Sequence, residues 1–168
     1  MNEVLQAIRQ RRSIRDFLPR PVPQELLEEI AAAGTWAPSG MNTQSFKFVV
    51  ITNPQLLSKL SQAVDPESCF FYGAPALILA ANRKDYEGAV PDCAAALQTM
   101  FLAAHSLGIS SCWVSQLNGR CDEKPIRELL TQCSLPKNYA VFGAAALGYA
   151  KAEAAVPARR ENTVLWVK

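Results

Sequence analysis

Apolar residues recur every three or four positions in several segments of the chain, which is the period of an amphipathic helix. The predicted helices begin after Asn2, run from Pro23 to a stop at Gly34, and cover residues 55–63, 92–107 and 125–133. Continuous apolar and β-branched runs predict four core strands, which cover residues 46–52, 75–81, 111–114 and 139–147. Because helices and strands alternate, we expect a sheet covered by helices.

Two further segments have no obvious place within a single chain. The helix predicted over residues 92–107 is apolar on almost every face, a pattern that is typical of a helix buried on all sides. Residues 163–167 predict a final strand that has no partner nearby in the sequence. We therefore expect the helix to lie at a subunit interface, and the strand to pair far away along the chain or with another subunit.

Length and composition indicate a folded protein. The chain has 168 residues, of which 49% are apolar and 19% charged, so one domain over residues 1–168 can bury a complete core. The net charge of +2 is too small for a general nucleic-acid binder. No apolar run has the length of a membrane span. No secretory signal follows Met1, and we expect a cytoplasmic protein with reduced thiols.

Few patterns in the sequence indicate catalytic side chains. The five cysteines form no C-x-x-C pair, and His105 is the one histidine, so no metal site is predicted. His105 is interpreted as a packed residue of the long helix. Neither G-x-G-x-x-G nor a P-loop motif occurs, and no serine elbow or pair of carboxylates stands out. We therefore name no catalytic residue.

Two short segments carry the strongest chemical signal. Arg11, Arg12, Ser13 and Arg15 lie within five residues, and guanidinium groups match phosphate oxygens bidentately. Residues 38–44 combine a Pro-Ser-Gly turn with two side-chain amides, which can both donate to and accept from a heterocycle. Taken alone, the first segment also fits a solvated charged face and the second an ordinary turn. Together they predict a site for a nucleotide or for flavin mononucleotide.

In their order along the chain these motifs resemble the nitroreductase family of FMN-dependent oxidoreductases. The similar segments are residues 11–17, 37–46, 73–78, 103–114, 147–149 and 157–160. They extend over almost the whole chain, and the first two are the most specific. The resemblance implies an α+β fold, in which a mixed sheet is flanked by helices. It also implies an intertwined homodimer that binds two FMN molecules at its interface.

The resemblance implies roles for individual residues near the flavin phosphate and ring. Arg11, Ser13 and Arg160 match positions that hold the FMN phosphate. Arg12 matches a neighbour that contacts phosphate or ribityl oxygens, and Arg15 matches the basic position near flavin N1 and O2. A positive charge there favours the anionic reduced flavin.

Other positions match backbone and loop elements of the same site. The resemblance implies that Pro38, Ser39 and Gly40 reach over the flavin from the other subunit. Asn42 and Gln44 are then near the ribityl chain or the ring. Val114 and Ser115 match a strand end whose backbone amide faces flavin N5.

The implied activity is transfer of electrons from NAD(P)H to a small acceptor, such as a nitroaromatic or a quinone, by a ping-pong mechanism. Alternatives are a flavin-fragmenting or dehalogenating member of the same superfamily, or a non-catalytic flavin-binding module. Two features depart from the family pattern. The segments between Ala81 and Asp92 and between Val114 and Pro125 leave little room for covering helices or a lid. Gln116 stands where the family often has glycine.

Overall fold

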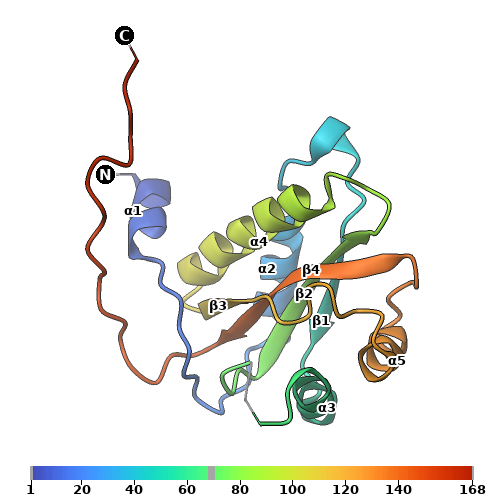
Figure 1. Cartoon of the computed structure of the whole chain (residues 1–168). Helices are drawn as coiled ribbons and strands as arrows, with labels where there is room; N and C mark the ends of the chain where they lie inside the picture. The colour runs from blue at the N-terminus through green and yellow to red at the C-terminus, as the bar shows by residue number, and fades with distance from the viewer. Residues whose placement is uncertain (1, 68–70, 168) are drawn as a thin grey trace.

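A computed structural model describes residues 2–67 and 71–167 (Figure 1). Its centre is a four-stranded sheet in the order β1-β2-β4-β3. The strands are β1 (Lys47–Ile51), β2 (Ala76–Arg83), β3 (Ser110–Val114) and β4 (Tyr139–Gly148), and every neighbouring pair is antiparallel. The four predicted core strands and the α+β class are thereby confirmed. Among the described residues the parallel pairing is one isolated bridge, between Ser13 and Ser111.

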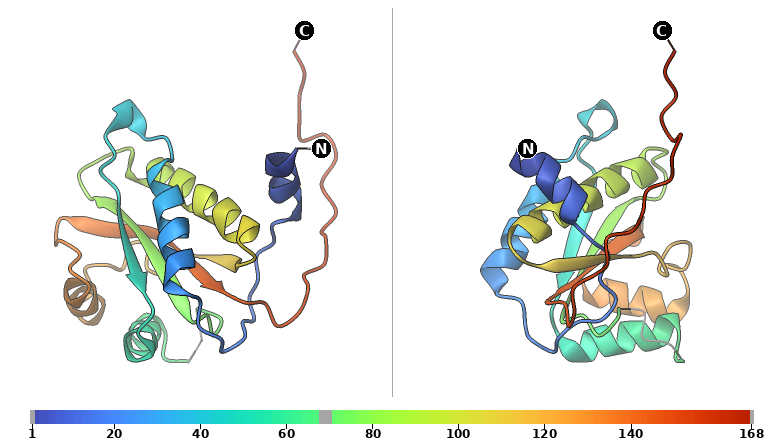
Figure 2. Two further views of the ribbon diagram at one scale, coloured as in Figure 1. Left: turned by 180° about the vertical axis from the view of Figure 1, so that it is seen from behind. Right: turned by 90° about the vertical axis from the view of Figure 1, so that its left-hand side faces the viewer.

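Helices cover both faces of this sheet (Figure 2). One face is covered by α2 (Gln24–Thr35) and α4 (Ala89–Ser106), and the other by α3 (Pro54–Val64) and α5 (Lys124–Gln132). Along β2, Ile78 packs in the core between the sheet and helices α2 and α4, whereas Leu77 and Leu79 pack in the core between the sheet and helices α3 and α5. A strand buried on both faces needs apolar residues at every position, which explains its uninterrupted apolar run.

Most helix boundaries differ from the expectation by a residue or so, and two of the differences are informative. The helix that was expected to stop at Gly34 continues to Thr35, and Gly34 is buried where α2 meets α4. A Cβ atom at this position would overlap the side chain of Met100, so the glycine permits close helix packing. The long helix begins at Ala89, three residues before its predicted start at Asp92.

Within one chain this helix is buried on one side and exposed on the other, so its expected burial at a subunit interface stays a prediction. Its buried side includes Leu97, Met100 and Ala104, whereas Gln98 is exposed and Val90 is 55% exposed. The sequence pattern could not distinguish these sides because small alanines occur on both.

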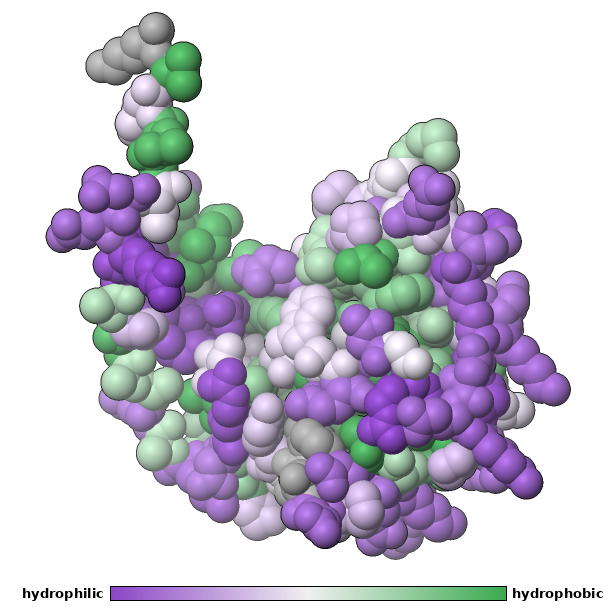
Figure 3. Space-filling model, viewed as in Figure 1, coloured by the Kyte–Doolittle hydropathy of each residue, from purple (hydrophilic) through white to green (hydrophobic). Residues whose placement is uncertain are grey.

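Both ends of the chain extend from this body (Figures 1 and 3). The first helix, α1 (Glu3–Gln10), has no buried residue, and Val4, Leu5 and Ile8 are exposed. The final strand predicted over residues 163–167 does not form within this chain, where these residues are irregular and exposed. Figure 3 shows apolar side chains along this tail. No helix in the described parts of the chain is long and apolar enough to cross a membrane.

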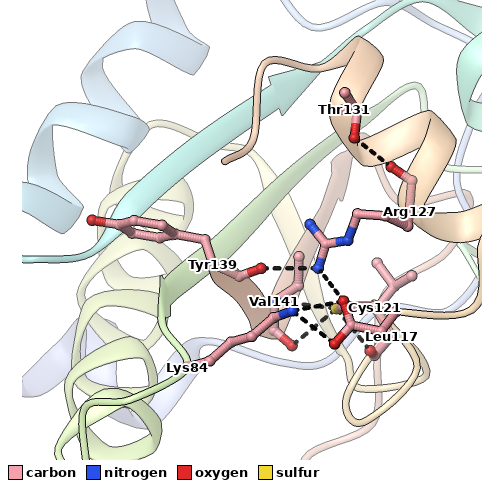
Figure 4. Close-up of polar contacts among 8 residues, drawn as sticks. Lys84, Leu117, Cys121, Arg127, Thr131, Tyr139 and Val141 are labelled. Atoms are coloured by element: carbon pink, nitrogen blue, oxygen red, sulfur yellow. Dashed lines mark hydrogen bonds and ion pairs between the residues drawn. The ribbon is translucent and has the colours of Figure 1, made fainter. Parts of the chain in front are cut away.

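A polar network fastens the segment after β3, and helix α5, to strand β4 (Figure 4). The Val141 backbone N–H donates to the Cys121 sulfur at 3.2 Å. Arg127 Nη2 donates to the Tyr139 carbonyl at 3.0 Å and to Asp122 at 3.1 Å. Burial raises the pKa of the Cys121 thiol, so this cysteine has a structural role. Cys69 lies outside the described residues.

Candidate functional site

The arginine segment is positioned by the end of α1 and by the edge strand β3. Arg11 is the C-cap of α1: its N–H still donates to the Ala7 carbonyl at 2.9 Å, but its own backbone leaves the helical conformation. The Ile14 N–H then donates to the Ser111 carbonyl at 2.9 Å, and Ser13 forms the parallel bridge to the same strand. The backbone around these arginines is therefore fixed against the sheet.

A cavity of about 660 Å³ lies where this segment meets the end of α4, the start of β3 and residues 150–154. Its polar lining includes Arg11, Arg12, His105, Ser110, Ser111 and Lys151. Two of the residues predicted to bind phosphate therefore lie together at one cavity. Glu153 also lines the cavity, so the cavity has both positive and negative side chains where residues 150–154 lie.

The two arginines of the cavity are held differently. Arg12 Nη1 donates to the carbonyls of Arg9 and Arg11 at 2.6 and 2.7 Å, which caps the end of α1. Arg12 Nε is buried and has no hydrogen-bond partner among the described residues. The Arg11 guanidinium lies 6.0 Å from the centre of the Phe101 ring, a cation–π contact.

The other residues predicted around the phosphate and ring are not all brought to this cavity. Ser13 and Arg15 are exposed and outside its lining. Burial raises the pKa of the Cys112 thiol, and the charges of Arg15 and Arg11 oppose this shift, so both guanidiniums act on the same part of β3. Arg160 is exposed in the tail and is not a lining residue.

At the other end of β3, the backbone amide that was predicted to face the flavin has a partner within the chain. The Ser115 N–H donates to Oε1 of Gln116 at 3.0 Å. Val114 is buried, whereas Ser115 is exposed. Gln116 therefore occupies the direction in which this N–H could approach a ligand.

The loop of residues 38–44 has an unusual backbone. It contains the 3-10 turn Gly40–Asn42, and Met41, Asn42 and Gln44 have φ values of 51°, 55° and 48°. The Gln44 N–H donates to Ser39 Oγ at 3.0 Å, and Gln44 Nε2 donates to Asn42 Oδ1 at 2.8 Å. The two amides predicted to read a heterocycle thus bind each other in this structure.

This loop lies beside the first turn of α4, at the opposite end of that helix from α1 (Figures 1 and 2). The Gly40 N–H donates to Asp92 in the first turn of α4, at 3.0 Å, whereas His105 in the last turn lines the cavity. Thirteen residues of helix correspond to about 20 Å. One chain therefore does not bring the two predicted motifs into one site.

Sequence reasoning missed several lining residues, including Ser110, Ser111 and Lys151, and His105 is the most informative of them. It was interpreted as a packed residue, but it is half-buried beside the cavity that contains Arg11. Its place in the last helical turn, just before Ser110 and Ser111, was the available signal. Helical spacing could not show that Arg11 approaches this turn from the start of the chain.

Nucleophilic and metal chemistry find little support. Burial, with the neighbouring Asp92 carboxylate, raises the pKa of Cys93 to about 12, so its thiol stays protonated near neutral pH. Burial also raises the pKa of Cys133. Within the described residues, no group of three or more His, Cys, Asp or Glu residues could hold a metal ion.

Comparisons with known proteins agree with the motifs. The sequence profile of the nitroreductase family matches residues 8–67 and 62–149. A protein of Archaeoglobus fulgidus with the provisional name NADH dehydrogenase/NAD(P)H nitroreductase is 36% identical over 157 residues, 91% of this chain and 88% of that protein. An iodotyrosine deiodinase of Haliscomenobacter hydrossis is 38% identical over 65 residues, 39% of this chain and 29% of that protein.

A solved structure extends the likeness to the fold. The nitroreductase of Bacteroides fragilis, crystallised with bound FMN, superposes with a TM-score of 0.95 at 35% identity, and the match covers 100% of both chains. The family profile covers most of the chain, and the relative from Archaeoglobus fulgidus matches over nearly its whole length. The chain therefore belongs to the nitroreductase family.

Proposed function

We propose that the protein is an FMN-dependent oxidoreductase that takes electrons from NAD(P)H and passes them to a small acceptor, such as a nitroaromatic or a quinone. The observation that carries the proposal is the cavity lined by Arg11 and Arg12, whose Arg12 Nε is buried without a partner among the described residues. The FMN bound to the Bacteroides fragilis nitroreductase supports the choice of cofactor.

The cavity residues fit a phosphate group. A phosphomonoester carries about −1.5 to −2 charges at neutral pH and three acceptor oxygens. Arg11 and Arg12 would donate to these oxygens, and the hydroxyls of Ser110 and Ser111 line the same space. When bound, FMN would supply the acceptance of hydride and the delivery of electrons. The residues of the chain would then bind, orient and shield it.

The proposed site is shared between two copies of the chain. The loop of residues 38–44 and the arginine cavity lie about 20 Å apart along α4, so both can surround one flavin when the loop comes from a second protomer. Exposed apolar residues on α1 and in the tail, such as Ile8, Leu165 and Trp166, would be covered in that dimer. We expect an interface of roughly 2,000 Å² or more.

A mixed dimer provides the sharpest test of sharing. Arg11→Ala damages only the cavity, and a chain with Asn42→Ala and Gln44→Ala damages only the loop. If sites are shared, co-expression of the two variants creates one intact site and one doubly damaged site per mixed dimer. We expect about half of the wild-type content of tightly bound FMN, with neither parent variant binding tightly. No recovery in purified mixed dimers, or a flavin-loaded monomer in sedimentation, would contradict the shared site.

The activity is tested with the purified, FMN-saturated protein under anaerobic conditions. NADH or NADPH should bleach the flavin absorbance, and addition of a nitroaromatic or quinone should restore it. Because the sequence contains no G-x-G-x-x-G motif for a separate nicotinamide site, the two substrates are proposed to bind in turn at one face of the flavin. Ping-pong kinetics, with parallel double-reciprocal lines, would follow. Bound FMN that neither nicotinamide cofactor reduces would favour a non-catalytic flavin-binding module instead.

Reductive removal of a halogen is the second candidate activity. The observation that favours it is the 38% identity with an iodotyrosine deiodinase, which covers only 29% of that protein. The same reduced enzyme can be mixed with a halotyrosine or with a nitroaromatic in parallel. Release of halide at a rate above that of nitroaromatic reduction would favour the dehalogenase.

A further inference from the structure

We propose that Tyr86 and Asp92 are positioning residues that hold the loop of residues 38–44 in the shape required at the flavin site. This inference rests on the proposed function for its ligand, but its geometry belongs to the single chain. The two residues lie in and just after the connection between β2 and α4. The brevity of this connection leaves little room for a covering helix, and its residues instead contact the loop.

Both backbone groups of Gly40 are bound by these side chains. The Gly40 N–H donates to Asp92 Oδ1 at 3.0 Å, and the Tyr86 hydroxyl donates to the Gly40 carbonyl at 3.3 Å. Asp92 is 5% exposed. A hydrogen bond to a charged, desolvated acceptor is among the stronger ones in proteins, so the Asp92 contact should dominate.

The tyrosine is seated between two glycines. A Cβ at Gly40 would lie 2.5 Å from the Tyr86 hydroxyl oxygen, and a Cβ at Gly88 would overlap the ring of the same side chain. Neither glycine has a positive φ, so a larger residue at either position would act through the space that the Tyr86 side chain occupies, which would have to shift. Gly40 in the loop and Gly88 at the start of α4 therefore both pack closely against the Tyr86 side chain.

The residue that follows the loop is fastened from the end of β2, just before this connection. Ser45 Oγ donates to Asn82 Oδ1 at 2.8 Å, and Asn82 is fully buried at the end of β2. Between the two anchors, Met41, Asn42 and Gln44 have left-handed backbones. Such conformations persist when the surrounding structure holds them. The anchors thus support this backbone together with the hydrogen bonds within the loop.

The first experiment measures the loop without any flavin. The full-length protein is labelled with ¹⁵N-glycine, and its Gly40 amide is assigned by the signal that Gly40→Ala removes. Hydrogen exchange at Gly40 should be at least about tenfold faster in Asp92→Ala than in wild type, because the amide loses a charged acceptor. Asp92→Asn, which keeps an acceptor oxygen but not the charge, should have an exchange rate between those of wild type and Asp92→Ala. Asp85→Ala is the matched control, since Asp85 lies in the same connection but pairs with Arg83.

The second experiment measures FMN affinity by titration. We expect Kd to rise about 10- to 100-fold in Asp92→Ala and about two- to tenfold in Tyr86→Phe, the ranges for charged and neutral hydrogen bonds. Tyr139→Phe is the control for loss of a tyrosine hydroxyl. Gly40→Ala should also weaken binding, and adding Tyr86→Phe should partly restore it, because the atom that the new Cβ would meet is then absent.

The outcomes separate this inference from the proposed function. Wild-type protein that binds no FMN would contradict the proposed function, while the Gly40 exchange rates would still test whether Tyr86 and Asp92 hold the loop. If the wild-type protein binds FMN, and Asp92→Ala and Tyr86→Phe bind it with the same Kd, the proposed role of Tyr86 and Asp92 is overturned. Unchanged FMN affinity with a lowered melting temperature would also overturn it, because a merely structural contact has that signature. If Asp92→Ala does not fold, the Gly40→Ala and Tyr86→Phe pair decides, and the absence of any rescue overturns the inference.

Discussion

Replacement of Arg11 by alanine should weaken the binding of FMN while leaving the binding of riboflavin nearly unchanged. Arg11 is half-buried at the cavity and is held above the Phe101 ring. Its proposed partner is the phosphate group, which riboflavin lacks. The difference between the two ligands therefore isolates the contact from any general disturbance of the site.

The expected size of the effect follows from the two contacts of this guanidinium. A hydrogen bond between charged groups contributes about 1.5–3 kcal/mol, so FMN affinity should fall by about 10- to 150-fold. The cation–π contact with Phe101, at 6.0 Å, contributes about 0.5–1 kcal/mol to the stability of the flavin-free protein. The loss of FMN affinity should thus exceed the loss of stability.

The assay is titration of each ligand by quenching of flavin fluorescence at fixed ionic strength, with urea unfolding of the flavin-free protein alongside. Arg9→Ala is the matched control, because Arg9 is exposed in the last turn of α1 and does not line the cavity. Equal loss of FMN and riboflavin affinity in Arg11→Ala would refute the assignment to phosphate. So would equal effects of Arg9→Ala and Arg11→Ala, which would indicate only a change in overall charge.

Three further substitutions test other parts of the structure. Gln116→Ala should raise FMN affinity about two- to tenfold by freeing the Ser115 N–H, and an unchanged Kd in the titration would contradict competition for this amide. Cys121→Ala should lower the free energy of unfolding in urea by about 1–3 kcal/mol, because the Val141 N–H loses its acceptor; Cys121→Ser should lose less, and equal losses would contradict a role for the hydrogen bond. The pKa of Cys93 is raised from 9.0 to about 12, so the folded protein retains a proton that the unfolded chain releases. The free energy of unfolding of the protein should therefore fall above pH 9, by up to about 1.4 kcal/mol per pH unit. Cys93→Ala should flatten the plot of this free energy, measured in urea, against pH. Parallel plots for the variant and the wild type would contradict the raised pKa of Cys93.

The strands were predictable because both faces of the sheet are covered by helices. In β2 every position from Ala76 to Asn82 is buried, so its apolar run contains no interruption that could be mistaken for a turn. Helix ends were less predictable. Glycine is typical of a helix stop, but Gly34 lies inside α2 and packs closely against Met100 of another helix. That contact joins residues far apart in the sequence.

The site was predictable in its components but not in its geometry. The charges of Arg11 and Arg12, and the turn at residues 38–44, indicate a phosphate and a heterocycle without indicating the distance between them. That distance is set by the length of α4, and the participation of His105 depends on where α1 ends. Local sequence also could not reveal that Gln116 returns to the Ser115 N–H.

Helix α4 connects these observations, because each of its ends supports a different part of the proposed site. Its first turn supplies Asp92 to the loop that contains Gly40, and its last turn supplies His105 to the arginine cavity. The helix holds these ends about 20 Å apart within one protomer. If two protomers share each flavin, then FMN binds the dimer and not the separated chains, and mass action requires that FMN stabilise assembly. The affinity for FMN and the strength of the dimer would then be two measures of one linked equilibrium.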